Sequence, residues 1–248
     1  MKTQILWEDT QILVCLKPAG LAVQSARPGE ADMVSELKNY LAASGKKDTP
    51  DRRKPPYLGV VHRLDQPVSG LLVFAKTPMA AASLSRQAAG NGMEKEYCAL
   101  VYVQDPQRLA HISPEGYPDA GTGQGIELVD FLKKEPGQNL SRVVDARTPG
   151  AKRAQLRLWI TDRQETQAGR VARVSVLLHT GRHHQIRVQL SHAGLPLLGD
   201  MRYGNGQSLA CSRSLGIRSL CLCACRLDFT HPATGKKMVF RTEEFPWK

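Results

Sequence analysis

Hydrophobic and polar residues alternate, or form short apolar runs, along many stretches of the chain. Alternation with a period of two is typical of strands that bury one face, whereas a short apolar run fits a strand buried on both faces. The pattern predicts a fold in which strands predominate. The expected strands cover residues 4–8, 12–17, 71–75, 94–103, 126–133, 152–161, 171–179, 219–229 and 237–241.

Helical spacing of apolar residues, three or four positions apart, occurs in three places. The first predicted helix covers residues 31–44. The second has Thr77 as its N-cap, a proline in its first position and Gly90 as its stop signal. The third is expected to follow a Thr180 cap and to end at Gly194.

These strands and helices do not follow a regular βαβα rhythm. We therefore predict the α+β class, with a largely antiparallel sheet and flanking helices. A charged, proline-rich loop is expected at residues 46–56, and an irregular segment at 104–125. A length of 248 residues suffices for one large domain or two small ones, and we expect a single domain over residues 1–248.

The charge of the chain points to a polyanionic partner. The formal net charge is +11 and 42% of the residues are hydrophobic, so we expect a real core together with affinity for RNA, DNA or anionic lipid. Glu8 and Asp9 interrupt any leader-like apolar region at the start. No apolar run approaches the roughly 20 residues that span a bilayer. We therefore expect a soluble, cytoplasmic protein.

Cysteines and histidines do not form a metal-binding pattern. The six cysteines include no C-x-x-C pair, and without an export signal disulfides are not expected. Cys221, Cys223 and Cys225 would share one face of a strand, where small thiols are more often core than ligands. His183, His184 and His192 lack partners at metal-ligand spacing, so we predict no metal.

Asp65 and Arg187 are the main candidates for chemistry. Asp65 follows two basic residues in "VHRLDQPVSG" and directly precedes a buried strand, so it is either a shielded nucleophile or base, or a turn residue. Arg187 adjoins the apolar stripe of the third helix, four residues after His183. A guanidinium near a core needs a carboxylate, for which Asp65 is a candidate; an RNA phosphate or solvent are the alternatives.

Tyr97 lies in the middle of a predicted strand. Its ring is either a platform that stacks on a base taken out of its helix, or an ordinary core tyrosine. The residue alone leaves both interpretations open.

Taken in order, five segments make the chain resemble the RluA-type pseudouridine synthases. They are "CLKPAGLAVQ", "HRLDQPVSGLLVFAKT", "KEYCALV", "TGRHHQIRVQLSHAGLPLLGDMRYG" and "CACRLDFTHPATG", and the residues that match the family within them run from 17 to about 235. The resemblance implies the α+β pseudouridine synthase fold, with a catalytic cleft across a largely antiparallel mixed sheet. Many members of this family also have a separate small N-terminal RNA-binding domain, and we expect this chain to lack it.

By this resemblance Asp65 is the catalytic aspartate, Tyr97 packs on the target uracil and Arg187 pairs with the aspartate. Arg63 corresponds to an arginine near the flipped-out nucleotide. The same motifs suggest further contacts to the substrate from His62, Arg182, His184 and Gln185.

The implied reaction converts uridine in structured ribosomal or transfer RNA to pseudouridine and needs no cofactor. Two positions depart from the family pattern. Val68 replaces a threonine in the catalytic loop, and Cys223 replaces a frequent histidine. The alternative function is a non-catalytic RNA-binding or assembly protein on the same fold.

Overall fold

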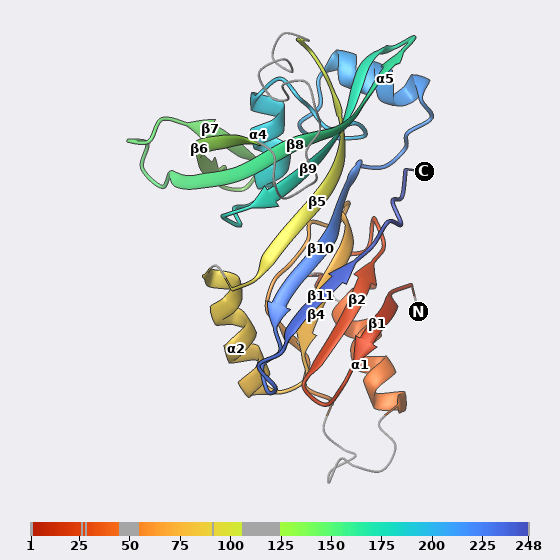
Figure 1. The fold of residues 1–248 in the computed structure, drawn as a ribbon, viewed down its shortest axis with the longest axis vertical. Coiled ribbons are helices and arrows are strands. Elements are labelled where there is room, and N and C mark those ends of the chain that lie inside the picture. Colours follow the sequence, from red (N-terminus) through yellow and green to blue (C-terminus); the bar gives the residue numbers. More distant parts are fainter. Residues whose placement is uncertain are drawn as a thin grey trace. The chain divides into compact units, whose positions relative to one another are not determined.

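The computed structural model describes residues 2–25, 27, 29–44, 55–90, 92–105 and 125–247, and these fall into two compact units (Figure 1). The first unit comprises the chain up to Lys95 together with Ala224–Pro246, and the second comprises Glu96–Cys223 with the C-terminal end. The single-domain organisation stays a prediction. Most of the predicted loops at 46–56 and 104–125 lie outside the described residues.

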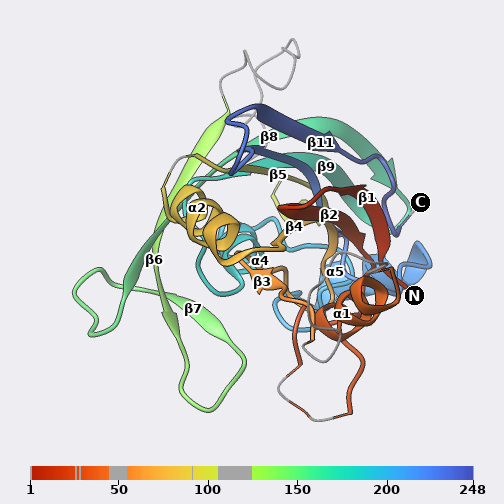
Figure 2. The same ribbon diagram turned by 90° about the horizontal axis from the view of Figure 1, so that it is seen from below.

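The first unit is built on a sheet with strand order β1-β2-β4-β10. β11 pairs with β10 and β3 pairs with β4, and the registered pairs within this unit are antiparallel. In its described residues, the helices of this unit are α1 and α2 (Figure 2). The bounds are β1 (Gln4–Glu8), β2 (Ile12–Lys17), α1 (Met33–Ser44), β3 (Gly59–Val60), β4 (Ser69–Ala75), α2 (Pro78–Ala89), β10 (Leu222–Thr230) and β11 (Lys237–Arg241).

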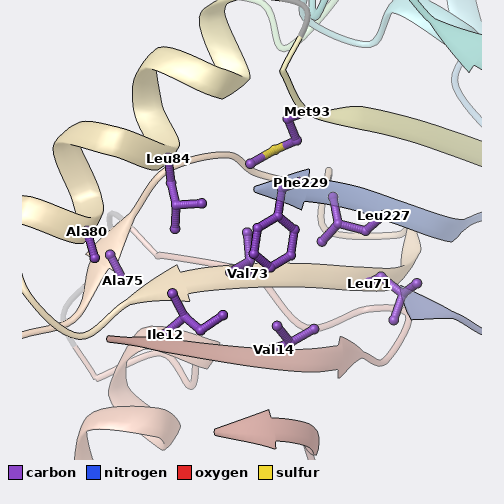
Figure 3. Packing of buried hydrophobic residues seen from close by; sticks show 10 residues of the cluster. All are labelled: Ile12, Val14, Leu71, Val73, Ala75, Ala80, Leu84, Met93, Leu227 and Phe229. Atoms are coloured by element: carbon purple, nitrogen blue, oxygen red, sulfur yellow. The ribbon is translucent and has the colours of Figure 1, made fainter. Parts of the chain in front are cut away.

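Alternate residues of β2 and β4 point toward α2 and form the core of this unit (Figure 3). Leu84 of α2 lies over Val73 of β4 and Phe229 of β10 in that cluster. The residues between them, such as Leu13 and Phe74, are also fully buried. β4 is therefore buried on both faces, as its continuous apolar run predicts.

Gly70 is required where β4 passes β10. Its φ is +126°, and a Cβ atom there would lie 2.4 Å from the backbone nitrogen and oxygen of Ala224. Only glycine combines this conformation with such a close approach of two backbones.

The second unit is an antiparallel sheet with strand order β5-β9-β8-β6-β7. α4 packs on β6 and β8 through Val188, which contacts Leu132 and Ala154. The β6–β7 hairpin can be followed in Figure 2. The bounds are β5 (Glu94–Tyr102), β6 (Ile126–Lys134), β7 (Ser141–Val144), β8 (Lys152–Thr166), β9 (Gly169–Leu178), α4 (Gln185–His192) and α5 (Gly206–Ser214).

Helix boundaries show where local sequence signals suffice. Thr77 caps α2 as predicted, because its Oγ1 accepts the N–H of Ala80 at 3.1 Å, and Gly90 ends the helix. α4 begins at Gln185 rather than after Thr180, so the predicted start is wrong. The reason is His184, whose left-handed φ of 56° interrupts the helical path. His183 therefore lies outside the helix, and its predicted i, i+4 relation to Arg187 within the helix is also wrong.

The predicted α+β class and largely antiparallel pairing are confirmed. The interpretation of the cysteines as core residues agrees with the structure, since the six thiols are free and all except that of Cys225 are buried. Burial raises the pKa of the Cys221 thiol to about 12, so it is protonated at neutral pH.

Candidate active site

Asp65 stands at the first position of a tight turn that leads into β4. Its carbonyl oxygen accepts the N–H of Val68 at 3.0 Å, and its side chain is partly exposed. The turn is bound to the preceding "KPAG" segment, because Gly20 N–H donates to the carbonyl of Gln66 at 2.9 Å. Gln66 Nε2 returns a bond to the carbonyl of Gly20 at 3.1 Å. The backbone that carries the carboxylate is thus held on two sides.

His62 and Arg63, the two residues before Leu64, lie in different environments. His62 Nε2 accepts the backbone N–H of Val73 in β4 at 3.2 Å. Burial, together with the positive charge of Lys95, lowers the pKa of His62 to about 3, so the ring is neutral. Arg63 is exposed, while Leu64 is only 8% exposed. His62 and Leu64 therefore attach this segment to the protein and leave the Arg63 side chain open to solvent.

Lys17 lies within hydrogen-bonding distance of the same turn and was not a candidate from its sequence. Its side chain is 0% exposed, and its Nζ donates to the carbonyls of Gln66 at 2.9 Å and Val68 at 2.6 Å. A lysine next to a proline turn is usually a surface residue, so the sequence pattern around Lys17 did not predict that it is buried. Val68 itself is buried, and these contacts to the turn's backbone need no hydroxyl at position 68.

In the second unit Arg187 forms a buried bidentate ion pair with Asp200. Nε donates to Oδ2 at 2.8 Å and Nη2 donates to Oδ1 at 2.7 Å. The two side chains are 6% and 0% exposed. Asp200 Oδ1 also accepts the backbone N–H groups of Arg202 and Tyr203 at 3.0 and 3.1 Å. Arg187 thus has a carboxylate partner in its own unit, and its predicted pairing with Asp65 stays a prediction.

Tyr203 connects several of the predicted substrate residues. Arg187 Cζ lies 5.0 Å from the centre of its ring, and His184 Nδ1 is 2.8 Å from its hydroxyl. The hydroxyl also accepts the N–H of Ser141 at 2.8 Å. His183 stacks on His184 with 3.7 Å between ring centres. The cluster fixes α4 against the start of β7.

This cluster carries excess positive charge. Burial lowers the pKa of His184 to about 3, and the charges of Arg187 and Arg202 act in the same direction. Burial likewise lowers the pKa of His183, with Lys134 among the cations that add to the effect. Both imidazoles are therefore neutral at pH 7, and the surrounding cations favour an anionic ligand such as phosphate.

Gln185 and Arg182 differ in how accessible their side chains are to a ligand. Gln185 is 3% exposed, and its Oε1 accepts bonds from Thr180 at 2.8 Å and from the Arg182 N–H at 2.9 Å. Its Nε2 donates to the Gln155 carbonyl at 3.1 Å, so the amide is used within the protein. Arg182 is exposed, with its Nε bonded to the Arg153 carbonyl at 2.9 Å. Contact of either residue with the substrate stays a prediction.

Tyr97 lies in β5 opposite Val176 of β9 and is 6% exposed. Burial leaves the ring little freedom to turn, which fits both stacking on a base and a core role. Its role therefore also stays a prediction.

In the described part of the chain, no group of three or more His, Cys, Asp or Glu side chains is arranged to hold a metal ion. Across the same residues, no helix has the length and apolar character needed to cross a membrane.

Known proteins match nearly the whole chain. The family model for RNA pseudouridylate synthase matches residues 11–192. Ribosomal large subunit pseudouridine synthase D of Zymomonas mobilis is 32% identical over 242 residues, which are 97% of this chain and 68% of that protein. Ribosomal large subunit pseudouridine synthase C is 33% identical in Salmonella typhimurium and in Escherichia coli K12. These two matches cover 94% of this chain but 64% of each relative, so the chain spans slightly less than two thirds of their length.

Solved structures agree on the fold. Human RNA Pseudouridylate Synthase Domain Containing 1 matches with a TM-score of 0.69 and 18% identity, over 98% of this chain and 83% of that chain. Human RNA Pseudouridylate Synthase Domain Containing 4 matches with a TM-score of 0.69 and 21% identity, over 98% of this chain and 88% of that chain. The α+β architecture is that of the pseudouridine synthases. Together with the family match, this shows that the chain belongs to the RluA-type family of RNA pseudouridine synthases, which are isomerases.

Proposed function

We propose that this protein converts uridine in structured ribosomal or transfer RNA to pseudouridine, with Asp65 as the catalytic carboxylate. The observation that carries the proposal is the setting of Asp65. A partly exposed carboxylate stands on a turn whose backbone is bound by Lys17 and Gly20, and His62, three residues before Asp65, is bound to β4. A carboxylate that must meet one sugar-base unit needs such a fixed support.

The reaction breaks the bond between uracil nitrogen 1 and the sugar, turns the base, and joins carbon 5 to the same sugar carbon. Carbon 5 loses its hydrogen and nitrogen 1 gains one, so no oxidant and no net water is consumed. Asp65 attacks the anomeric carbon, attacks the uracil ring, or assists a glycal route; the fixed carboxylate suits each of the three. The side chain of Tyr97 is proposed to stack on the base.

The target uridine must leave its stack, at a cost of a few kcal/mol. Phosphate contacts from a basic surface can offset this cost. In the second unit, exposed Arg182 and the cations around His183 suit that role, and in the first unit exposed Arg63 does. Ribosomal RNA is favoured over transfer RNA, because the matched relatives are named for the large ribosomal subunit. The cytoplasmic location stays a prediction.

Tritium release tests the function and the role of Asp65 together. Ribosomal and transfer RNA are transcribed with uridine tritiated at carbon 5, and each pool is incubated with the wild type, with Asp65→Asn, and with Asp162→Asn as a control at an exposed carboxylate of β8. We expect release with the wild type and the control, and a loss of at least about a thousandfold in Asp65→Asn with RNA affinity nearly unchanged.

Two other outcomes would change the proposal. Release that persists in Asp65→Asn would overturn the assignment of the catalytic carboxylate. RNA binding by the wild type without release from either pool would instead favour the non-catalytic RNA-binding protein.

A further inference from the structure

In the part of the chain that the structure describes, His184 is the one residue other than glycine with a left-handed backbone. Its φ is 56° and its ψ is 26°. A Cβ atom in this conformation lies too close to the following carbonyl oxygen, which costs free energy. The residue is also only 6% exposed. Such a conformation persists where the surrounding contacts hold it, and it is found most often at functional sites.

Helix capping does not account for this conformation. His184 directly precedes Gln185, the first residue of α4, but its side chain makes no hydrogen bond to the end of the helix. Its backbone carbonyl does accept the N–H of Val188 at 3.0 Å and so closes the first turn of α4. The backbone angle at His184 therefore sets the direction in which α4 begins.

Tyr203 holds His184 in place. The Tyr203 hydroxyl lies 2.8 Å from His184 Nδ1, and the two rings meet edge to face with 5.6 Å between their centres. Burial raises the pKa of Tyr203 and lowers the pKa of His184 to about 3, so the phenol keeps its hydrogen and the imidazole is neutral at pH 7. Because the hydroxyl accepts the N–H of Ser141, its own hydrogen is available to Nδ1.

Tyr203 is also attached to α4 beyond Arg187. Its backbone carbonyl accepts the hydroxyl of Ser191, in the last turn of α4, at 2.7 Å. Its ring lies 5.0 Å from Arg187 Cζ, a distance typical of a cation–π contact. Its N–H donates at 3.1 Å to Asp200, the carboxylate that binds Arg187. One tyrosine thus contacts α4 before Arg187, at Arg187 and after it.

We propose that His184 and Tyr203 are positioning residues for Arg187. The left-handed turn at His184, held by the Tyr203 hydroxyl, fixes the first turn of α4 and with it the place of the Arg187 guanidinium over the Tyr203 ring. The inference rests on the proposed function, and it takes Arg187 to act beside the catalytic carboxylate, as the resemblance to the family implies. His184 then acts through Arg187, in place of the expected contact between His184 and the substrate.

Two changes at position 184 separate the backbone conformation and its hydrogen bond from the imidazole itself. Asparagine tolerates the left-handed region, and its Oδ1 stands where Nδ1 of histidine does, whereas alanine offers no acceptor and disfavours this conformation. We expect His184→Ala to lower kcat in the tritium assay about tenfold to a hundredfold, with KM within about threefold, because a misplaced active-site group costs that much. His184→Asn should restore most of the lost kcat.

Tyr203→Phe tests the hydrogen bond alone, because it keeps the ring that contacts Arg187. Its kcat should fall by about the same factor as that of His184→Ala. Combining the two changes should lower kcat little further, since both break the same contact. Val171→Ala, a buried position of β9 in a different core cluster, is the control for lost stability.

Two results would overturn the proposal. The first is a kcat in both His184→Ala and Tyr203→Phe that is no lower than that of Val171→Ala, which would leave the contact without a role in positioning. The second is a failure of His184→Asn to restore kcat together with a raised KM, which would show that the imidazole itself binds the substrate.

A measurement that needs no turnover covers the case in which His184→Ala does not fold. The Arg187 Nε–H group donates to the buried Asp200, so its hydrogen should exchange slowly with solvent and can be followed by ¹H–¹⁵N NMR. Tyr203→Phe should shift this resonance and speed up its exchange, whereas Val171→Ala should leave both unchanged. An unchanged resonance in Tyr203→Phe would refute the positioning role. The tritium assay separates the two proposals, since an inactive wild type contradicts the function while this resonance still reports on Arg187.

Discussion

The Arg187–Asp200 pair is the contact in the second unit whose loss we expect to be most damaging. Both side chains are almost completely buried and are joined by two hydrogen bonds. Removing one member leaves the other as an uncompensated buried charge, which costs about 3–5 kcal/mol. We expect Arg187→Met to lower the free energy of unfolding by that amount, as measured by urea denaturation.

The same measurement on three more variants separates the pair from general damage. Arg187→Met combined with Asp200→Asn should cost less than the two single changes added together, because the second change no longer strands a charge. Arg213→Met, at an exposed position of α5, should change stability by about 0.5 kcal/mol or less. Strict additivity in the double variant would contradict a coupled pair.

Individual residues also show where sequence reasoning stops. Asp65, His62 and Arg63 could be proposed as site residues because a motif gathers them into one short segment. Lys17 and Asp200 were missed because their partners lie 49 to 51 and 13 residues away, and nothing in a linear pattern joins such positions. Buried partners of a charged group become visible only when the fold brings them together.

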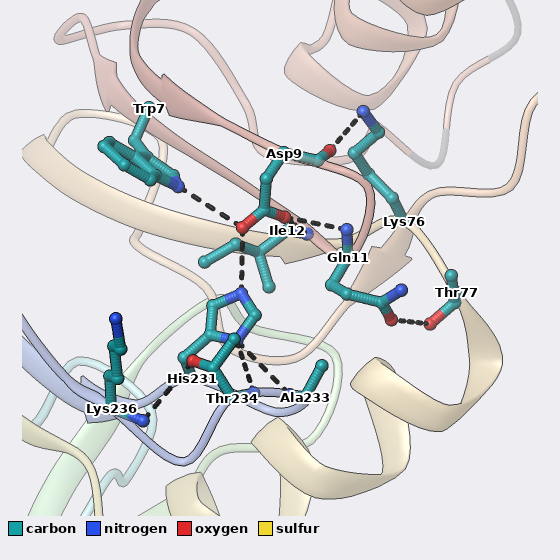
Figure 4. A network of polar contacts seen from close by, with 10 residues as sticks. All are labelled: Trp7, Asp9, Gln11, Ile12, Lys76, Thr77, His231, Ala233, Thr234 and Lys236. Carbon is teal, nitrogen blue, oxygen red and sulfur yellow. Dashed lines mark hydrogen bonds and ion pairs between the residues drawn. The ribbon is translucent and has the colours of Figure 1, made fainter.

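Among the secondary-structure elements, the β1–β2 turn and the β10–β11 turn are joined by the partly exposed Asp9 and the buried His231 (Figure 4). His231 Nε2 lies 2.8 Å from Asp9 Oδ2, and His231 Nδ1 accepts the N–H of Thr234 at 3.1 Å. Since Nδ1 is an acceptor, Nε2 carries the proton and donates to Asp9. Asp9 Oδ1 in turn accepts the N–H groups of Gln11 and Ile12 at 2.7 and 2.8 Å. The network joins elements from the two ends of the chain.

The network predicts an acid-dependent contribution to stability. Burial acts to raise the pKa of Asp9, but the hydrogen bonds from Ile12, Gln11 and His231 outweigh it and bring the pKa below the usual 3.8. A carboxyl with a lowered folded-state pKa adds stability above its unfolded-state pKa and loses it as the pH falls through the folded-state value. Asp9→Asn should therefore destabilise the protein by about 1–3 kcal/mol at pH 7.

Urea denaturation at pH 7 and at a series of acidic pH values checks this expectation. The difference between the wild type and Asp9→Asn should shrink as the pH falls through the folded-state pKa of Asp9, because the carboxyl is then protonated in both states. Glu94→Gln, at an exposed carboxylate, should show little effect at any of these pH values. A difference that stays constant with pH would show that the Asp9 charge has no part in it.

The elements themselves could be predicted unequally well. β1, β2 and β11 have the predicted bounds, and α2 has its predicted cap and stop, because these depend on local alternation and capping chemistry. β7 and α5 were not predicted. β7 has four residues, and the nine-residue α5 is rich in polar residues, so neither shows a clear period. The late start of α4 depends on the left-handed backbone angle of His184, which the neighbouring residues do not predict.

For the molecule as a whole, the excess of 34 basic over 23 acidic residues predicts how its binding to the proposed RNA substrate depends on salt. Each phosphate neutralised by Lys or Arg releases counterions. The association constant therefore falls with the salt concentration raised to a power of about 0.7–0.9 for each phosphate contact. If three or more phosphates are contacted, raising KCl from about 50 to 200 mM should weaken binding by roughly tenfold or more. Asp65→Asn is the suitable protein for this titration, because it is expected to bind RNA without converting it.

Single exposed arginines then assign the contacts. Arg182→Ala should reduce the slope of log Kd against log salt by about one, since it removes one phosphate contact. Arg86→Ala, an exposed position of α2 with no place in the proposed site, should leave the slope unchanged. Equal slopes for Arg182→Ala and its parent would exclude Arg182 from the RNA contact. Binding that does not respond to salt at all would mean that the net charge of +11 does not serve RNA recognition.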